Sequence, residues 1–256
     1  MNPFLSLLVV TTLFAAVGVL ERTPALRYAP LAARRPYLAT DSAWHLVAAA
    51  ANLVSTFVFR PQLAKLNLSA IPNLEALPVG ARLVVAVVVY DFVATLIHIG
   101  MHRSDLLWAV HKVHHSSLHL DALATTRTHA FEHLVRNVPA QGALFVLGAS
   151  GDTVSIALIT YAVFALGGHS NMGVGNSRLE TILVTPRYHR LHHIPATTQH
   201  NFGTILTVWN RAFRRLANAN VTPSELMGVP GEVHTYPQRF LQAFRQPAAE
   251  LTAALR

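Results

Sequence analysis

Apolar residues occur in long, nearly unbroken runs along this chain, and polar segments separate the runs. The first three cover residues 3–20, 43–59 and 82–99, and Asp91 interrupts the third. A helix needs about 20 residues to cross the hydrocarbon core of a bilayer, so each run approaches the length of one crossing. The first run lacks the basic start and the cleavage site of a secretory signal, and we expect it to be retained as a helix.

A fourth apolar region is divided in two. Residues 137–149 and 153–168 lie on either side of the sequence Ser150-Gly151-Asp152. Each half is shorter than a crossing of about 20 residues, and the polar break is typical of a turn. We expect a helical hairpin that enters and leaves on one side; a tilted, shallow or complete double crossing stays open. The whole pattern predicts an all-α, multi-pass membrane protein with about four hydrophobic helical elements.

Composition supports a membrane location. Hydrophobic residues make up 52% of the chain and charged residues only 12%, whereas about a quarter of the residues are charged in soluble proteins. The net charge of +8 is not accompanied by basic runs interleaved with aromatic residues, so anionic lipid head groups explain it better than nucleic acid. Cysteine is absent, which excludes disulfides and thiolate ligands.

The positions of the basic residues predict an orientation in the membrane. Lys and Arg favour the cytoplasmic side in short loops. Four arginines follow the first apolar run: Arg22, Arg27, Arg34 and Arg35. They predict a cytoplasmic first loop, and two further crossings then place the histidine-rich part of the chain in the cytoplasm as a helical cap. Arg60 and Lys65 in the opposite loop weaken this asymmetry.

Histidines gather in three motifs, one H-x3-H and two H-x2-HH. They are His98 and His102; His111, His114 and His115; and His189, His192 and His193. Residues three or four apart share one face of a helix, so we expect each motif to direct its imidazoles one way. Eight convergent imidazoles exceed the needs of one metal ion and suit two, and imidazole binds iron, zinc, copper or nickel. The repeated H-x2-HH argues against scattered surface histidines.

Asp91 lies on the same helical stripe as the first histidine motif. It precedes His98 by seven residues, nearly two helical turns. A carboxylate inside an apolar span is costly and usually has a partner. We expect Asp91 to orient a ligand histidine or to bind metal itself; the alternative is an aspartate that holds a neighbouring helix.

The motifs and the residues between them resemble the fatty acid hydroxylase and sterol desaturase superfamily of integral-membrane, non-haem di-iron oxidoreductases. The resemblance covers roughly residues 88–215. The shared features are an acidic residue before the first motif, Leu-Trp before the second and Ser after it, an Arg-x-His-x-x-Glu element, a lone His-x-Asn, Thr-Pro before the third motif, and Asn-Phe-Gly and Trp-Asn after it. In this chain they are Asp91, Leu107, Trp108, Ser116, Arg127, His129, Glu132, His169, Asn171, Thr185, Pro186, Asn201, Phe202, Gly203, Trp209 and Asn210.

Two positions depart from the family pattern. The family often has proline where this chain has Ala130, and aspartate where it has Asn210. Neither position is a histidine of the motifs, so the expectation of metal binding is unaffected. The departures do weaken any transfer of substrate identity from the family.

The resemblance implies an enzyme that oxidises a membrane lipid, with hydroxylation favoured and desaturation as the alternative. It implies two non-haem iron ions, O2 as co-substrate, and electrons from a separate reductase, ferredoxin or cytochrome. It also implies that His169 is a ninth ligand beside the eight motif histidines. The residues that it implies around the ligands are Asp91, Glu132, His129 and Asn201.

The remaining histidines are expected to have other roles. Four of them lack a partner at ligand spacing, and we expect structural or surface positions for these: His45, His119, His200 and His234. His129 and His133 form a further H-x3-H, for which a structural or substrate-side role is favoured over metal binding.

Two other functions compete with lipid oxidation. A metal transporter would hold its ligands near mid-membrane, whereas most motif histidines lie at or beyond the ends of the apolar runs. A non-catalytic lipid-binding relative is disfavoured by the intact motifs. We therefore expect one membrane domain over residues 1–256, with its catalytic core at 88–215. The lipid stays open among a sterol, a fatty acyl chain, a sphingolipid, an ether lipid and a carotenoid.

Overall fold

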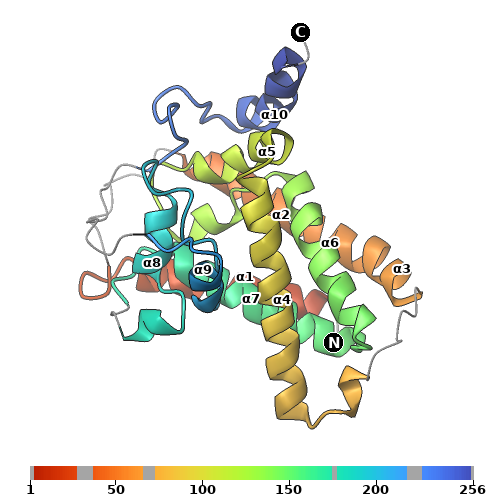
Figure 1. Ribbon diagram of the computed structural model, residues 1–256. Helices are drawn as coiled ribbons and strands as arrows, with labels where there is room; N and C mark the ends of the chain where they lie inside the picture. Colours follow the sequence, from red (N-terminus) through yellow and green to blue (C-terminus); the bar gives the residue numbers. More distant parts are fainter. Residues whose placement is uncertain (1–2, 28–36, 66–72, 175–177, 218–226, 255–256) are drawn as a thin grey trace.

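The computed structural model describes residues 3–27, 37–65, 73–174, 178–217 and 227–254. Every secondary-structure element in these ranges is a helix, which confirms the all-α fold (Figure 1). The α-helices are α1 (Pro3–Leu20), α2 (Leu38–Val54), α3 (Arg60–Lys65), α4 (Val79–Met101), α5 (Asp105–His115), α6 (Ala130–Val146), α7 (Gly151–His169), α8 (Pro186–His192), α9 (Val208–Ala212) and α10 (Phe240–Ala254). Short π or 3-10 segments are η1 (Ser55–Phe59), η2 (Leu74–Ala76), η3 (Ala122–Thr126) and η4 (Leu179–Thr181).

Three helices among the described residues are long and apolar enough to cross a membrane. They are the continuous helix Leu38–Lys65, which joins α2, η1 and α3, and the helices α4 and α7. Large apolar side chains on them remain exposed, among them Leu46, Phe57 and Val84. Such surface is suited to lipid contact. The chain is an integral membrane protein, and the first predicted run forms the apolar helix α1. Arg34 and Arg35, used to predict orientation, lie outside the described residues.

Helix α4 lies at the centre of the molecule and packs against both α6 and α7 (Figure 1). Small side chains such as Ala94, Ala140 and Ala157 are fully buried where these helices meet. They let the backbones approach closely. Tyr90 and Tyr161 fill the same core with ring centroids 5.1 Å apart. This packing fixes the ends of α4 and α7, both of which carry histidines.

Helices α6 and α7 form the hairpin that the break in the fourth apolar region predicted. Gly148 adopts a φ of 75° in the connection, and a Cβ there would lie 2.9 Å from the side-chain oxygen of Asn73. Ser150 then caps α7 by accepting a hydrogen bond from the Thr153 amide at 3.3 Å. The second half is longer than expected, because α7 has 19 residues and reaches the length of a span.

The C-terminal helix α10 covers α2 and α5 on the histidine-bearing side of the protein. Trp44 of α2 is fully buried there, with its ring centroid 4.8 Å from that of Phe240. Lys112 of α5 donates to Glu232 at 2.7 Å and to Glu250 at 2.9 Å. Apolar packing and paired charges therefore brace α5, the helix that carries the second histidine motif.

Candidate metal centre

Four helices end at one buried site, and the nine predicted ligand histidines lie in or just after their C-terminal parts. Local sequence sets where two of these helices begin. Ser104 caps α5 through the Leu107 amide at 3.4 Å, and Thr185 caps α8 through the Tyr188 amide at 3.2 Å, followed by Pro186 in the first turn. Such caps satisfy amides that lack a partner at a helix start. The C-termini of α4, α5, α7 and α8 point their partial negative charge towards the site, which favours cations.

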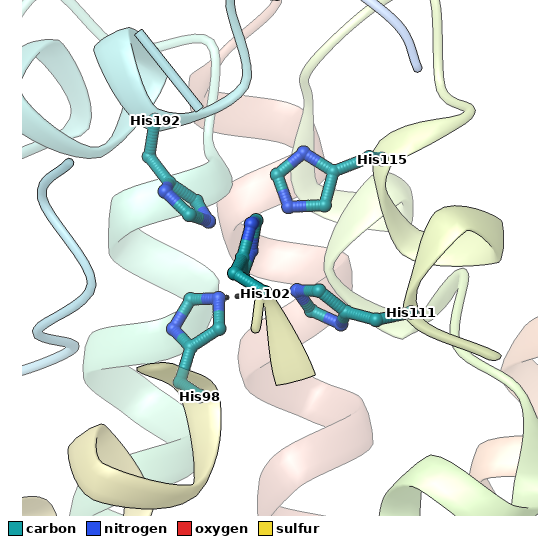
Figure 2. Close-up of side chains that lie close together, drawn as sticks. All are labelled: His98, His102, His111, His115 and His192. Carbon is teal, nitrogen blue, oxygen red and sulfur yellow. Dashed lines mark hydrogen bonds between the residues drawn. The ribbon is translucent and has the colours of Figure 1, made fainter. Parts of the chain in front are cut away.

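The first group of histidines comes from α4, α5 and α8. It contains His98, His102, His111, His115 and His192, all buried, and one ligand atom from each lies within 4.8 Å of the others. Figure 2 shows their imidazole rings gathered around a common space. The Nε2 atoms of His98 and His111 are 3.1 Å apart. Both ring nitrogens of His102 are buried without a hydrogen-bond partner.

The second group comes from α5, α7 and α8. It contains His114, His169, His189 and His193, again buried and within the same limit of 4.8 Å. The Nε2 atom of His169 lies 2.9 Å from that of His114, 3.1 Å from that of His189 and 3.2 Å from that of His193. The two groups adjoin, because the rings of His115 and His193 stack with centroids 4.6 Å apart.

The two H-x2-HH motifs each divide between the groups, which corrects the expectation that each motif points one way. On α5, His111 and His115 join the first group and His114 joins the second. On α8, His189 and His193 join the second group and His192 the first. Residues four apart share a helix face, whereas the residue between them lies on a neighbouring face. One motif therefore serves both groups.

The donor set fits bound metal ions. Imidazole nitrogens bind a metal such as zinc at about 2.0–2.1 Å, so two ligands at right angles around one ion lie about 3.0 Å apart. The nitrogen separations within both groups are of this size. Several buried nitrogens lack any other partner, including Nε2 of His115 and Nε2 of His192. Buried polar atoms without partners are costly, and a metal ion in each group would satisfy them.

The outer nitrogens of several ligand histidines bond to backbone carbonyls. His98 Nδ1 lies 2.8 Å from the Phe202 oxygen and His192 Nδ1 lies 2.7 Å from the His200 oxygen. His169 Nδ1 lies 2.7 Å from the Ala165 oxygen. A carbonyl can only accept, so each Nδ1 donates and each Nε2 presents its lone pair to the group.

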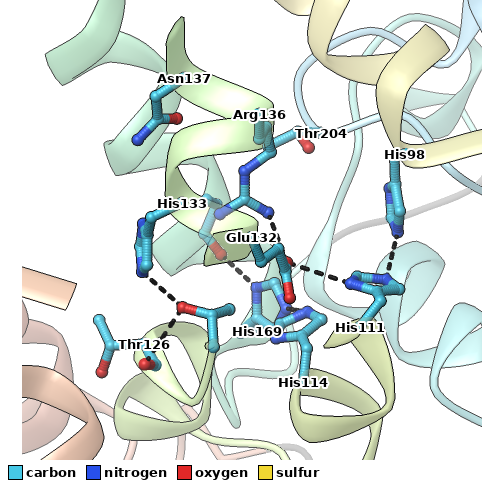
Figure 3. A network of polar contacts seen from close by, with 12 residues as sticks. His98, His111, His114, Thr126, Glu132, His133, Arg136, Asn137, His169 and Thr204 are labelled. Atoms are coloured by element: carbon cyan, nitrogen blue, oxygen red, sulfur yellow. Dashed lines mark hydrogen bonds and ion pairs between the residues drawn. The ribbon is translucent and has the colours of Figure 1, made fainter. Parts of the chain in front are cut away.

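A carboxylate performs the same task for His111. Glu132 Oε1 lies 3.1 Å from His111 Nδ1 and accepts a hydrogen bond from Arg136 Nη1 at 3.3 Å (Figure 3). Burial raises the pKa of Glu132, but the neighbouring His111 and Arg136 outweigh this and hold the pKa below its ordinary value. Glu132 is therefore ionised and carries a negative charge beside the first group.

Burial lowers the pKa of five ligand histidines that lie outside the spans. The pKa of His114, His115, His189 and His193 falls well below the ordinary value, first through desolvation and then through neighbouring histidines. For His192 desolvation lowers the pKa to about 3. Neutral imidazole is the form that binds metal. These five imidazoles are thus already in the protonation state that a metal requires.

Of the four residues predicted to lie around the ligands, only one contacts a ligand histidine with its side chain. Glu132 contacts a ligand histidine directly. Asp91 instead accepts from the amides of Ile205 and Leu206, each at 3.0 Å, and from Trp209 Nε1 at 2.8 Å. Its carboxylate therefore holds the loop that presents the Phe202 carbonyl to His98, which is an indirect role rather than the expected direct one.

His129 and Asn201 lie outside the metal centre. His129 caps α6 through the Phe131 amide at 3.2 Å, and its ring packs on Phe244. Asn201 has a φ of 59° and bonds through its side chain to the Tyr188 carbonyl and the Ala217 amide, each at 3.0 Å. The contact with His192 comes instead from the neighbouring His200 carbonyl.

The histidines expected outside the ligand set are not members of either group. His119 and His234 are exposed, and His200 is half-buried. His45 packs against Phe14 with ring centroids 5.1 Å apart. Buried His133 contacts the Thr128 hydroxyl. Sequence reasoning missed Arg136, although its position four residues after Glu132 on one helix is the spacing of a paired side chain.

A pocket opens beside the second group. His114, His169 and His189 line it together with His133 and Arg136, and His98 of the first group lines it as well. Its lining also has an aliphatic part, with Ala48 and Ala49 from α2 and Leu158 and Ala162 from α7. The empty volume is about 890 Å³ including the open mouth. A second pocket shares Val10, Ala49, Asn52, Leu158 and Ala162 with the first and continues to Arg60.

Known proteins are similar in sequence to the part of the chain that contains this site. The sequence model of the fatty acid hydroxylase family matches residues 83–215. Ornithine lipid hydroxylase OlsE from Rhizobium tropici is 30% identical over 172 residues, which cover 66% of this chain and 51% of that protein. Alkylglycerol monooxygenase from Danio rerio is 31% identical over 125 residues, which cover 47% of this chain and 27% of that protein. The chain thus spans about half the length of the ornithine lipid hydroxylase and about a quarter of the length of the alkylglycerol monooxygenase. No solved structure gives a significant match.

Proposed function

The chain belongs to the fatty acid hydroxylase family, and from this membership we propose that it hydroxylates a membrane lipid with O2 at two histidine-bound iron ions. The observation that carries the proposal is the pair of adjoining imidazole groups, of five and four histidines, at the wall of a partly aliphatic pocket. Hydroxylation is favoured over desaturation because the two relatives described above are named a hydroxylase and a monooxygenase.

The residues of the chain would bind and orient the reactants. Nine imidazoles would hold the ions, and iron bound there would supply the activation of O2 that an unactivated C–H bond requires. Glu132 and the backbone carbonyls of Phe202 and His200 fix the tautomers of three ligands. The aliphatic wall formed by α2 and α7 would place the lipid against the second group and exclude water.

We further propose a cytoplasmic metal centre that receives electrons from a separate reductase, ferredoxin or cytochrome. Two of the basic residues that support this orientation, Arg22 and Arg27, follow α1 in the described structure. Lys112, which lies on the side of the protein that carries the histidines, is already paired with Glu232 and Glu250.

Metal analysis and product analysis of the purified protein test the function together. We expect two irons per chain and, with a matching electron donor and labelled O2, a lipid product heavier by one labelled oxygen atom. A lipid lacking two hydrogens would show desaturation instead. Protein that binds no iron when reconstituted anaerobically with Fe(II) contradicts the proposal.

Variants of one histidine from each group separate the metal role from folding. His114→Ala and His192→Ala should each lose bound iron and lipid oxidation, while membrane insertion and elution as a folded protein in detergent persist. His234→Ala, at an exposed position, is the matched control and should stay close to wild type. Wild-type turnover in either of the first two variants would refute the assignment.

A further inference from the structure

Among the described residues that line the pocket beside the second histidine group, one carries a fixed positive charge and none is acidic. Arg136 is the cation, and its lining neighbours in this part of the pocket are His133, Asn137 and Thr126. Figure 3 shows Arg136 next to Glu132 on the same helix, with His133 and Asn137 close by. Glu132, the acidic partner of Arg136, is itself turned to His111 and does not line the pocket.

Half of the Arg136 guanidinium lacks a protein partner. Glu132 accepts a single hydrogen bond, from Nη1, and Nε is buried without a partner. The unused donors, Nε and Nη2, form one edge of the planar guanidinium fork. Such an edge matches the two oxygens of a carboxylate. A buried donor without a partner is costly, so the pocket is incomplete until an acceptor enters it.

The remainder of the cavity is suited to a hydrocarbon chain. Ala49, Leu158 and Ala162 belong to both pockets, and the second pocket adds Leu53 and Ile159. The path that leads away from Arg136 is therefore largely apolar, with Asn52, Thr56 and Ser155 as polar residues in its lining. Arg60 at its far end is better satisfied, because its Nε donates to Gln141 at 3.0 Å and its Nη1 to Ser155 at 2.8 Å.

We propose that Arg136 binds the carboxylate of an amphiphilic substrate, so that the polar end of the lipid lies at the metal centre and its tail runs along α2 and α7. This inference rests on the proposed function and adds the substrate class to it. The opposite orientation would place hydrocarbon against the unpaired guanidinium edge, which costs free energy without a compensating hydrogen bond. It follows that the oxidised carbon lies near the polar end of the substrate.

Binding measurements with matched charged and neutral probes test the proposal. The probes form two pairs: hexadecanoate with hexadecanol, and N-hexadecanoylglycine with its amide. Each probe is titrated at pH 8 into purified iron-loaded protein to which a neutral fluorescent lipid is bound. The quantity compared is the ratio of the Kd of a variant to that of the wild type for one probe, because partitioning into detergent then cancels. The two carboxylates distinguish a free fatty acid from an acylated amino acid.

For Arg136→Gln we expect the Kd of a carboxylate probe to rise about tenfold, as for loss of a charge-assisted hydrogen-bonded pair. Glutamine can still donate to Glu132, so the metal centre should keep its iron. The Kd of the neutral probes should change by less than about twofold. The Kd of a carboxylate probe for Arg136→Lys should lie between those for the wild type and Arg136→Gln, because lysine keeps the charge and loses the planar pair of donors. Arg60→Gln is the matched control and should leave the carboxylate affinity unchanged.

Dependence of either carboxylate on Arg136 supports the proposal and identifies the carboxylate that fits. The proposal is overturned if the affinity for neither carboxylate depends on Arg136, or if that affinity depends on Arg60 instead. If Arg136→Gln does not fold, the melting temperature of the wild-type protein is measured with each probe instead. At equal concentrations of probe in the micelles, hexadecanoate should raise the melting temperature more than hexadecanol does. Equal shifts overturn the proposal. Lipid oxidation with carboxylate-independent binding contradicts only this inference, whereas carboxylate binding without any oxidation contradicts only the proposed function.

Discussion

Glu132 links the metal centre to the pocket through two contacts. Its Oε1 lies 3.1 Å from His111 Nδ1 and 3.3 Å from Arg136 Nη1. A carboxylate that accepts from the outer nitrogen of a ligand histidine fixes the ring and makes it a stronger donor to the metal. The same carboxylate balances the guanidinium that we assign to substrate binding. One side chain therefore serves both halves of the site.

Replacement of Glu132 should weaken metal binding without unfolding the protein. For Glu132→Gln we expect the affinity for Fe(II) to fall about 10–100-fold, the usual effect of losing a carboxylate behind a ligand histidine. Titration against a competing chelator measures this affinity. Glu250→Gln, which alters the ion pair with Lys112 at 2.9 Å and the hydrogen bond from Gln246 at 3.1 Å but no contact of Glu132, is the control. Equal affinities for Glu132→Gln and wild type would show that His111 does not depend on Glu132.

Helical spacing predicted eight of the nine histidines and the family resemblance added His169, but neither predicted their division into two groups. The H-x2-HH motif was expected to point one way, whereas His114 and His192 join the group opposite to their flanking partners. A helix turns by about 100° per residue, so the central imidazole of such a motif faces another side. The bonds of His98 and His192 to backbone carbonyls depend on a folded loop, and no motif specifies them.

At the scale of elements, α4 and the loop after α8 form one unit through Asp91. The carboxylate accepts from two amides of residues 205 and 206 and from the Trp209 indole. That loop provides the Phe202 carbonyl for His98 of the same helix. An acidic residue in an apolar span thus stabilises a loop that contains no helix or strand, only an isolated bridge from Leu206 to Leu183.

Loss of this carboxylate should destabilise the protein and the first histidine group together. Asp91→Ala leaves three donors without their acceptor, so we expect unfolding in detergent to be easier by about 3 kcal/mol or more. Iron content should fall as well, because the Phe202 carbonyl is no longer held against His98. Asp105→Ala, at an exposed position on α5, is the control. An unchanged melting temperature for Asp91→Ala would exclude this anchoring role.

Hydrophobic runs predicted the helices well and their ends less well. The runs at 43–59, 82–99 and 153–168 correspond to the observed Leu38–Lys65, Val79–Met101 and Gly151–His169. The observed helices are longer because polar residues at their ends, such as Asp41 and His169, are buried within the protein and so do not interrupt the helix. Polar residues on α6, including Asn137 and Gln141, face other helices rather than lipid, which hydropathy does not reveal.

At the scale of the whole molecule, the helix ends define two opposite sides. α4 begins at Val79 near η2 and ends beside the metal centre, and α7 also ends there at His169. The return of the hairpin to this side reunites segments that are far apart in the chain. The assignment of this side to the cytoplasm remains a prediction from the charge pattern.

Single cysteines report the orientation cleanly, because the chain has no cysteine of its own. His119→Cys places a thiol on the side of the metal centre, and Ala76→Cys places one at the start of α4; both positions are exposed. A maleimide that cannot cross membranes should label the second variant in intact cells and the first only in opened cells. The reverse pattern contradicts the cytoplasmic assignment but leaves the metal centre intact.

The division of each H-x2-HH motif between two imidazole groups has a consequence for how the centre is assembled. Helices α5 and α8 each contribute to both groups, so an ion that settles in one group pins the same two helices that must present ligands to the other. Binding of the first ion therefore positions ligands for the second. We expect loading to be cooperative, with empty and doubly loaded molecules outnumbering those that hold a single ion.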